Sequence, residues 1–216
     1  MDALKHIIEK FNIDLEQKSP IKLPFDRFRG LTGLFRELEF KVGAEIGVDK
    51  GRYSKWICQK VPNIKLYCID PWNAYDEYVE QHGEAGQVVL DDCYKAAKER
   101  LAPYNVKFIK KTSMKALKDF EDESLDFVFI DGNHTYEYVA EDIAQWEKKV
   151  RKGGIVSGHD FWRSSEMKKP YILGLDPVRR MKLCQVKDVV ESWTYANQIK
   201  YFITSGDGCP SWFYVK

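Results

Sequence analysis

Val42-Gly43-Ala44-Glu45-Ile46-Gly47-Val48-Asp49-Lys50-Gly51 has the pattern of a short buried strand that breaks into a glycine loop and then opens a helix. The apolar residues after it keep the spacing of a helix that lies on a sheet. They are Tyr53, Trp56, Ile57 and Val61. The glycines let backbone amides approach a ligand closely, and the helix N-terminus offers unpaired N–H donors with a partial positive charge. The stretch therefore predicts a cradle for an anionic group.

The glycine spacing argues against two common ligand classes. Dinucleotide sites carry G-x-G-x-x-G, but Asp49 stands two residues after Gly47, and its carboxylate would repel a pyrophosphate. A P-loop needs Gly-Lys followed by Ser or Thr, and residues 50–52 have another order. What remains is E-x-G-x-x-x-G, formed by Glu45, Gly47 and Gly51, which resembles the first motif of class I S-adenosylmethionine-dependent methyltransferases. The resemblance implies that these three residues bind S-adenosylmethionine.

Strands and helices alternate from Val42 onward, which predicts a doubly wound α/β sheet with helices on both faces. Apolar runs at 66–69, 106–109, 125–130 and 155–158 each lead into polar residues. Ligands bind at the carboxyl ends of such parallel strands. Two last strands, 200–204 and 212–215, are joined by a turn that predicts an antiparallel hairpin. This pattern resembles the Rossmann-like, seven-stranded methyltransferase sheet, mainly parallel with a C-terminal antiparallel hairpin.

The N-terminal region carries two helical stripes, at residues 4–11 and 31–38, with an irregular link marked by Pro20 and Pro24. We interpret residues 1–40 as an N-terminal helical extension and residues 41–216 as the S-adenosylmethionine-dependent methyltransferase domain. The extension is expected to cover one face of the sheet, with closure of a ligand crevice or subunit pairing as alternatives. Residues 163–181 interrupt the alternation and are expected to shape a substrate pocket.

Three further residues are candidates for cofactor binding. Asp70 follows the second strand of this alternation, where a carboxylate can accept hydrogen bonds from both hydroxyls of a ribose. A turn residue before Pro71 is the alternative interpretation. Ser113 and Met114 follow the third strand, at the place where this fold usually contacts adenine, although Ser113 is equally suited to cap a helix.

Two motifs follow the next two predicted strands. Asp131-Gly132-Asn133-His134, combined with a Gly153-Gly154 pair and then Asp160, resembles the family that includes macrolide-sugar O-methyltransferases and cephalosporin-biosynthesis proteins. The resemblance implies that Asp131 and Asp160 are acidic ligands of a divalent metal and that His134 is the general base. Asp131 is accordingly assigned to catalysis, cofactor binding and metal binding. His159 falls where an acidic ligand is more usual, and is either a third metal ligand or a core histidine.

The chemistry of methyl transfer explains why such residues are needed. Transfer from a sulfonium is an in-line displacement, so the enzyme chiefly aligns donor and acceptor and makes the acceptor nucleophilic. Mg²⁺ or another divalent cation can lower the pKa of an acceptor hydroxyl, or His134 can take the proton directly. We therefore expect O-methylation of a small molecule, with a sugar or glycosylated metabolite as one class. A macromolecule-modifying methyltransferase and a non-catalytic nucleoside-binding module are the alternatives.

Composition bounds the remaining possibilities. At 216 residues and 44% hydrophobic content, the chain suits one well-buried domain. A net charge of +1 gives no overall field for nucleic acid or an anionic membrane, so neither partner is expected. Five dispersed cysteines without a C-x-x-C pair fit a reducing compartment, and the first twenty residues lack a signal or membrane segment. We expect a soluble cytoplasmic protein with a small-molecule acceptor, and leave a homo-oligomer open.

Overall fold

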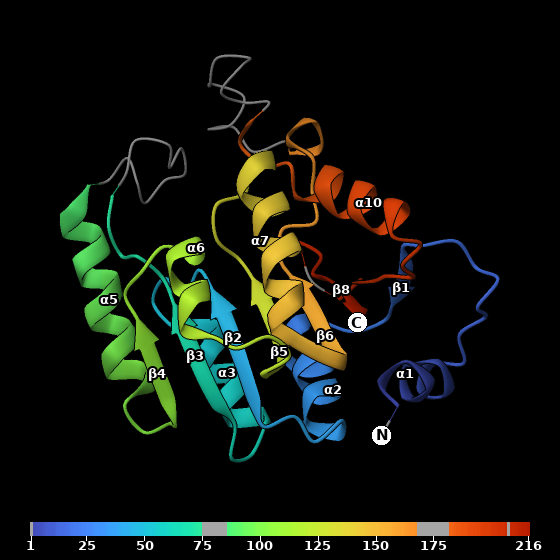
Figure 1. Cartoon of the computed structure of the whole chain (residues 1–216), viewed down its shortest axis with the longest axis horizontal. Coiled ribbons are helices and arrows are strands. Elements are labelled where there is room, and N and C mark those ends of the chain that lie inside the picture. The colour runs from blue at the N-terminus through green and yellow to red at the C-terminus, as the bar shows by residue number, and fades with distance from the viewer. Residues whose placement is uncertain (1, 75–85, 168–181, 207) are drawn as a thin grey trace.

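The computed structural model describes residues 2–74, 86–167, 182–206 and 208–216. Within these residues, eight strands form one sheet in the order β1-β7-β8-β6-β5-β2-β3-β4 (Figure 1). The strands are β1 (Ile21–Leu23), β2 (Val42–Ile46), β3 (Lys65–Ile69), β4 (Val106–Ile109), β5 (Leu125–Ile130), β6 (Val150–Gly158), β7 (Phe202–Thr204) and β8 (Trp212–Val215). Only β8 runs antiparallel to its neighbours, β6 and β7. The predicted parallel sheet with an antiparallel C-terminal pair is confirmed.

Helices cover both faces of the sheet (Figure 1). The first hydrophobic core contains residues of four helices: α1 (Ala3–Phe11), α2 (Thr32–Glu37), α3 (Arg52–Lys60) and α5 (Gln87–Leu101). The second core contains α6 (Ser113–Ala116), α7 (Tyr136–Lys149) and α10 (Val186–Ala196). Short helical turns are η1 (Arg27–Leu31), η2 (Leu117–Asp119) and η3 (Ser164–Glu166). This arrangement leaves the strand ends as the edge of the sheet that is open to a ligand.

Alternation along β5 shows how the strands serve two cores at once. Phe127 and Phe129 belong to the first core, whereas Val128 and Ile130 belong to the second. Successive side chains of a strand point to opposite faces, so the middle of a central strand in this sheet is expected to be apolar on both faces. Phe127 stacks on Phe35 of α2, with ring centroids 4.0 Å apart. The strand is thereby held on both faces. Its one charged residue, Asp126, lies near its start, and Asp131 follows its last residue.

The N-terminal region differs from the expected helical extension in one element. The two helical stripes form α1 and α2, but the expected irregular link contains β1, which pairs in parallel with β7. Ile21 lies opposite Phe202 and Leu23 lies opposite Thr204. The sheet therefore has one strand more than the seven predicted, because this edge position tolerates the flanking prolines. Residues 168–181 of the expected pocket-shaping segment lie outside the described residues.

Candidate active site

A cavity of about 460 Å³ opens at the carboxyl ends of β2, β3 and β5. β2 lies between β3 and β5, where the order of the strands reverses, and this is the usual ligand position in doubly wound sheets. The lining includes Gly47, Asp49, Asp70, Trp72, Leu90, Ser113, Met114, Asp131, Tyr138 and Asp142. Residues from four separate motifs of the sequence are thus brought to one cavity, including Gly47, Asp70, Ser113, Met114 and Asp131 of the predicted cofactor set.

Gly47 is required by the close approach of two strand ends. Its φ is +84°, and a Cβ atom there would lie 1.9 Å from the carbonyl oxygen of Asp131. Only glycine fits such a contact. Gly51, which was also predicted to bind the cofactor, does not line the cavity. It precedes α3 with a φ of +68°, and its missing side chain makes room for Leu101.

Asp70 braces the glycine turn from the neighbouring strand. Its Oδ2 accepts hydrogen bonds from the amides of Val48 at 2.9 Å and Asp49 at 3.0 Å, and its Oδ1 accepts one from the amide of Trp72 at 2.7 Å. Burial raises the pKa of Asp70, and the three amides oppose that shift. A carboxylate has further lone pairs. The residue can therefore hold the turn in shape and still face the cavity, where a ribose is expected.

Glu45 lies behind the cavity rather than in it. Its side chain is 2% exposed and accepts a hydrogen bond from the hydroxyl of Ser54 in α3. Burial raises the pKa of Glu45 to about 8, against the effect of that hydrogen bond. Glu45 does not line the cavity, because its side chain points to the opposite face of β2 from that of Ile46, which does. Its role in cofactor binding stays a prediction.

Ser113 and Asp142 both line the cavity and form a hydrogen-bonded polar pair, of which Asp142 is buried. The hydroxyl of Ser113 donates to the Asp142 carboxylate, and Trp146 Nε1 donates to Ser113 Oγ at 2.7 Å. Burial raises the pKa of Asp142 to about 7, against the effect of the Ser113 hydrogen bond. Thr112, not Ser113, is the N-cap residue of α6, so the capping interpretation of Ser113 was wrong. The sequence reasoning also missed Asp142, which lies within α7 and belongs to no motif.

Next to the cavity, Asp131 meets two histidines and a second carboxylate. His134 Nε2 lies 3.4 Å from Asp131 Oδ1 and 3.5 Å from Asp160 Oδ2. His159 Nδ1 lies 3.8 Å from Asp131 Oδ1 and 3.3 Å from Asp160 Oδ1. The strand ends explain the meeting, because Ile130 of β5 is paired with Gly158 of β6. The four residues predicted to handle catalysis or metal therefore share one cluster, and Asp131 links it to the cavity.

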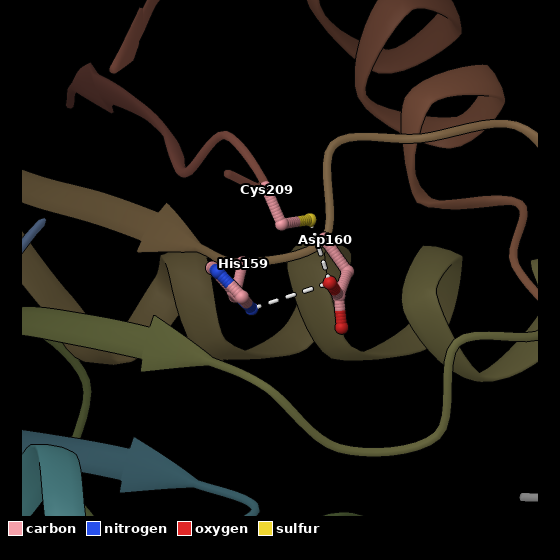
Figure 2. Close-up of side chains that lie close together, drawn as sticks. All are labelled: His159, Asp160 and Cys209. Atoms are coloured by element: carbon pink, nitrogen blue, oxygen red, sulfur yellow. Dashed lines mark hydrogen bonds and ion pairs between the residues drawn. The ribbon is translucent and has the colours of Figure 1, made fainter. Parts of the chain in front are cut away.

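Cys209 joins this cluster from the loop between β7 and β8 (Figure 2). Its thiol donates to Asp160 Oδ1 at 2.7 Å. Burial raises the pKa of the Cys209 thiol, and the Asp160 carboxylate raises it further. Burial also disfavours ionised Asp160, but the hydrogen bond from His159 and the imidazoles of His134 and His159 outweigh it and hold the pKa of Asp160 below its usual range. No sequence motif pointed to Cys209.

The donor set of the cluster suits a divalent cation. Ligand atoms lie within 4.8 Å of one another in two sets of three. The sets are His159, Asp160 and Cys209, and Asp131, His134 and Asp160. Imidazole nitrogen, carboxylate oxygen and thiol sulfur are the ligands that proteins offer to zinc and related metals, whereas Mg²⁺ prefers oxygen alone. The predicted ligands Asp131, His159 and Asp160 thus lie in one cluster. The nitrogen and sulfur atoms of this cluster are softer ligands than those of a typical magnesium site.

Arg27 of η1 brings a positive charge to the same edge. Its Nη1 lies 3.6 Å from Asp131 Oδ2, and its guanidinium lies over the rings of Phe28 at 4.9 Å and Tyr53 at 5.3 Å. These aromatic contacts orient the side chain. The N-terminal region therefore contributes to the electrostatics of the site, which the sequence reasoning did not foresee.

Solved structures share this fold across almost the whole chain. An O-methyltransferase from Bacillus cereus in complex with S-adenosylhomocysteine (SAH) has a TM-score of 0.60 at 17% identity, covering 100% of this chain and 91% of that one. TomG from Streptomyces achromogenes, an O-methyltransferase involved in tomaymycin synthesis and solved with S-adenosylmethionine, has a TM-score of 0.59 at 17% identity, covering 100% and 90%. The fold is therefore that of class I S-adenosylmethionine-dependent methyltransferases.

Sequence comparison gives the family. The methyltransferase domain family matches residues 44–161, which run from β2 to just beyond β6. This chain belongs to that methyltransferase domain family. The uncharacterized protein y4gI of Sinorhizobium fredii is 30% identical over 126 residues, which is 54% of this chain and 12% of that protein. The chain thus spans a small part of the length of this relative.

Among the helices in the described part of the chain, none is both long and apolar enough to cross a membrane.

Proposed function

We propose that this chain transfers the methyl group of S-adenosylmethionine to a hydroxyl of a small molecule, with a sugar or glycosylated metabolite as the acceptor class. One observation carries the proposal: Asp131 lines the cavity at the strand ends and also lies 3.4 Å from the imidazole of His134. A donor in the cavity and an acceptor beside His134 would then be neighbours. Catalysis of this kind depends mainly on such alignment.

The cavity supplies groups that match the nucleoside part of the donor. The amides of Val48 and Asp49 already donate to Asp70, and the remaining lone pairs of the Asp70 carboxylate can accept hydrogen bonds from the ribose hydroxyls. The polar pair of Ser113 and Asp142 lies where adenine is expected, and the Asp142 carboxylate can accept a hydrogen bond from the exocyclic amine. Met114 and Leu90 add apolar surface for the base. The mixed polar and apolar lining supports a nucleoside ligand.

The neighbouring cluster supplies the acceptor chemistry. His134 is the proposed general base, because imidazole is the side chain suited to proton transfer near neutral pH, and because His134 lies 3.4 Å from Asp131, which lines the cavity. Asp131 and Asp160 both lie beside Nε2 of His134, and their negative charges would stabilise the imidazolium that forms when the hydroxyl proton is taken. A divalent cation held by Asp131, His159 and Asp160 would lower the pKa of the acceptor hydroxyl.

Donor binding is tested by calorimetry with SAH. We expect wild-type protein to bind, and Asp70→Asn to bind about 10- to 100-fold more weakly, because an amide nitrogen would face the turn amides and a charge-assisted bond would be lost. Asp122→Asn is the matched control, since its side chain is 68% exposed and pairs with Lys149 away from the cavity. Absence of SAH binding to wild-type protein would remove the donor assignment.

Acceptor class is tested with S-adenosylmethionine labelled in its methyl group. We expect label to enter the small-molecule fraction of a cell extract, and His134→Ala to reduce the rate by about 10²- to 10⁴-fold while SAH affinity is kept. His6→Ala is the control, because His6 pairs with Glu37 on the N-terminal helices. Label in protein or nucleic acid instead would favour a macromolecule-modifying enzyme. Binding of SAH without any transfer would favour a nucleoside-binding module.

A further inference from the structure

We propose that Cys209 is a metal ligand, and that with His159 and Asp160 it makes the site select a borderline transition metal, with Zn²⁺ as the best match, over Mg²⁺. The inference deepens the proposed function, on which it rests, by naming the class of cation at the acceptor side. It concerns the choice of metal, which is measurable without any methyl acceptor.

The three side chains converge from two separate parts of the chain (Figure 2). His159 and Asp160 follow β6, and Cys209 precedes β8. The Cys209 sulfur lies 2.7 Å from Asp160 Oδ1, and His159 Nδ1 lies 3.3 Å from the same oxygen. Sulfur, nitrogen and oxygen all lie within 4.8 Å of one another. Ligand atoms so close can share one ion, since zinc bonds are about 2.0–2.3 Å long.

The fold holds Cys209 in this place through backbone contacts. Gly158, the last residue of β6, is paired with Trp212, the first residue of β8. The amide of Phe161 also donates to the carbonyl of Pro210 at 3.0 Å. These two contacts hold the loop that carries Cys209 against the chain just before His159 and just after Asp160. A site held this way is preorganised for a ligand.

Asp160 separates the proposed metal from the proposed base. Its Oδ1 faces His159 and Cys209, whereas its Oδ2 lies 3.5 Å from His134 Nε2. Asp160 is in the left-handed region with a φ of +47°, a conformation that asparagine and aspartate tolerate better than most residues. One carboxylate therefore serves two neighbours. His134 stays available as a base while His159 and Cys209 bind the cation.

Ligand chemistry decides the class of cation. Mg²⁺ requires oxygen ligands in octahedral geometry and keeps much of its water. A thiolate and an imidazole favour zinc, and exclude magnesium by affinity rather than by size. Cys184 also lies near, but its sulfur contacts the backbone carbonyls of Asp160 and Trp162 at 3.4 Å, and it belongs to neither set of convergent ligand atoms. The neighbouring cysteine is therefore a control and not a ligand.

Cobalt spectroscopy tests the inference directly. Apo-protein prepared with a chelator and kept reduced by a phosphine is titrated with Co²⁺. We expect a sulfur-to-cobalt charge-transfer band in the near ultraviolet, and intense visible bands of a low-coordinate ion. Zn²⁺ should remove these bands at equimolar concentration, and Mg²⁺ should not remove them in large excess. The band should be lost in Cys209→Ser and kept in Cys184→Ser and Cys58→Ser.

Affinity gives the second measurement. We expect Cys209→Ser to weaken Zn²⁺ binding by about 100-fold. Loss of a residue that only supports a metal ligand costs about 10- to 100-fold, and loss of a ligand itself should reach the upper end of that range. Cys209→Asp keeps a ligand but replaces sulfur by oxygen, so it should bind metal without the charge-transfer band and with a smaller preference for Zn²⁺ over Mg²⁺. Weak octahedral cobalt bands with no charge transfer in wild-type protein, or an unchanged band in Cys209→Ser, would overturn the inference.

These outcomes are separable from the proposed function. SAH calorimetry on the same apo- and metal-loaded samples reports the donor site. Normal SAH binding together with a failed cobalt titration would reject only the metal assignment. A cobalt–sulfur band in protein that binds no SAH would keep the metal site and reject the methyltransferase proposal. Retained SAH binding in Cys209→Ser also shows that this variant is folded.

Discussion

Two buried carboxyl groups near the cavity make the stability of this chain depend on pH. Burial raises the pKa of Glu45 from 4.5 to about 8 and that of Asp142 from 3.8 to about 7. Between the unfolded and folded pKa values, the folded chain holds a proton that the unfolded chain has lost. The free energy of unfolding therefore falls as pH rises through this interval, and it is lowest above the folded pKa.

Glu45→Gln tests this dependence. Glutamine is neutral at every pH and can still accept the hydrogen bond from Ser54. We expect its free energy of unfolding in urea to decline less than that of wild type between about pH 5 and pH 8, and to exceed it by an amount on the order of 1–2 kcal/mol at about pH 8. Asp122→Asn, an exposed control, should follow the wild-type slope. Parallel slopes for Glu45→Gln and wild type would contradict a buried proton at residue 45.

At the scale of single elements, the local hydrophobic pattern was enough to predict the strands and helices that pack into the two cores. The apolar run 125–130 predicts β5 with its observed bounds, Leu125–Ile130, because a central strand must be apolar on both faces. The apolar residues Val186, Val189, Val190 and Trp193 likewise keep the spacing of one helical face, and they lie in α10 (Val186–Ala196). The polar strand ends followed from the same reasoning. For this reason Asp70 and Asp131 were found at the cavity from sequence.

Elements that depend on distant partners were missed. β1 has three residues between two prolines. It is a strand only because it pairs with β7, which lies about 180 residues further along the chain. Cys209 carries no motif and reaches His159 only because β8 pairs with β6. Asp142 lies in α7, where the spacing of the apolar residues indicates only that the helix packs on the sheet. The buried position of Glu45 behind the cavity was not predicted, because a motif gives spacing along the chain but not the face of the strand on which each side chain lies.

The first forty residues share one hydrophobic core with the rest of the chain. Ile7, Leu31, Leu34 and Phe35 are completely buried against the first core. Phe35 stacks on Phe127 of β5, and β1 covers the edge of the sheet beside β7. Arg27 adds a charge 3.6 Å from Asp131. The predicted boundary at residue 40 therefore divides one hydrophobic core.

A chain that begins at residue 41 tests whether that boundary separates two parts. Loss of the four buried side chains alone removes roughly 6–12 kcal/mol of apolar burial, comparable with the total stability of about 5–15 kcal/mol of a typical domain. We expect no cooperative thermal unfolding and no near-ultraviolet circular dichroism signal from residues 41–216 alone.

Phe35→Ala in the full-length chain measures how much one buried side chain of the first forty residues contributes to stability. The variant should remain folded but lose about 3–5 kcal/mol, the usual cost of removing a buried phenylalanine. Leu15→Ala, at a side chain that is 45% exposed, is the control and should unfold like wild type. If residues 41–216 instead unfold cooperatively at the wild-type temperature and bind SAH, the first forty residues are a separable extension. In that case the contacts of Phe35 and Arg27 would be accessory to a domain that folds without them.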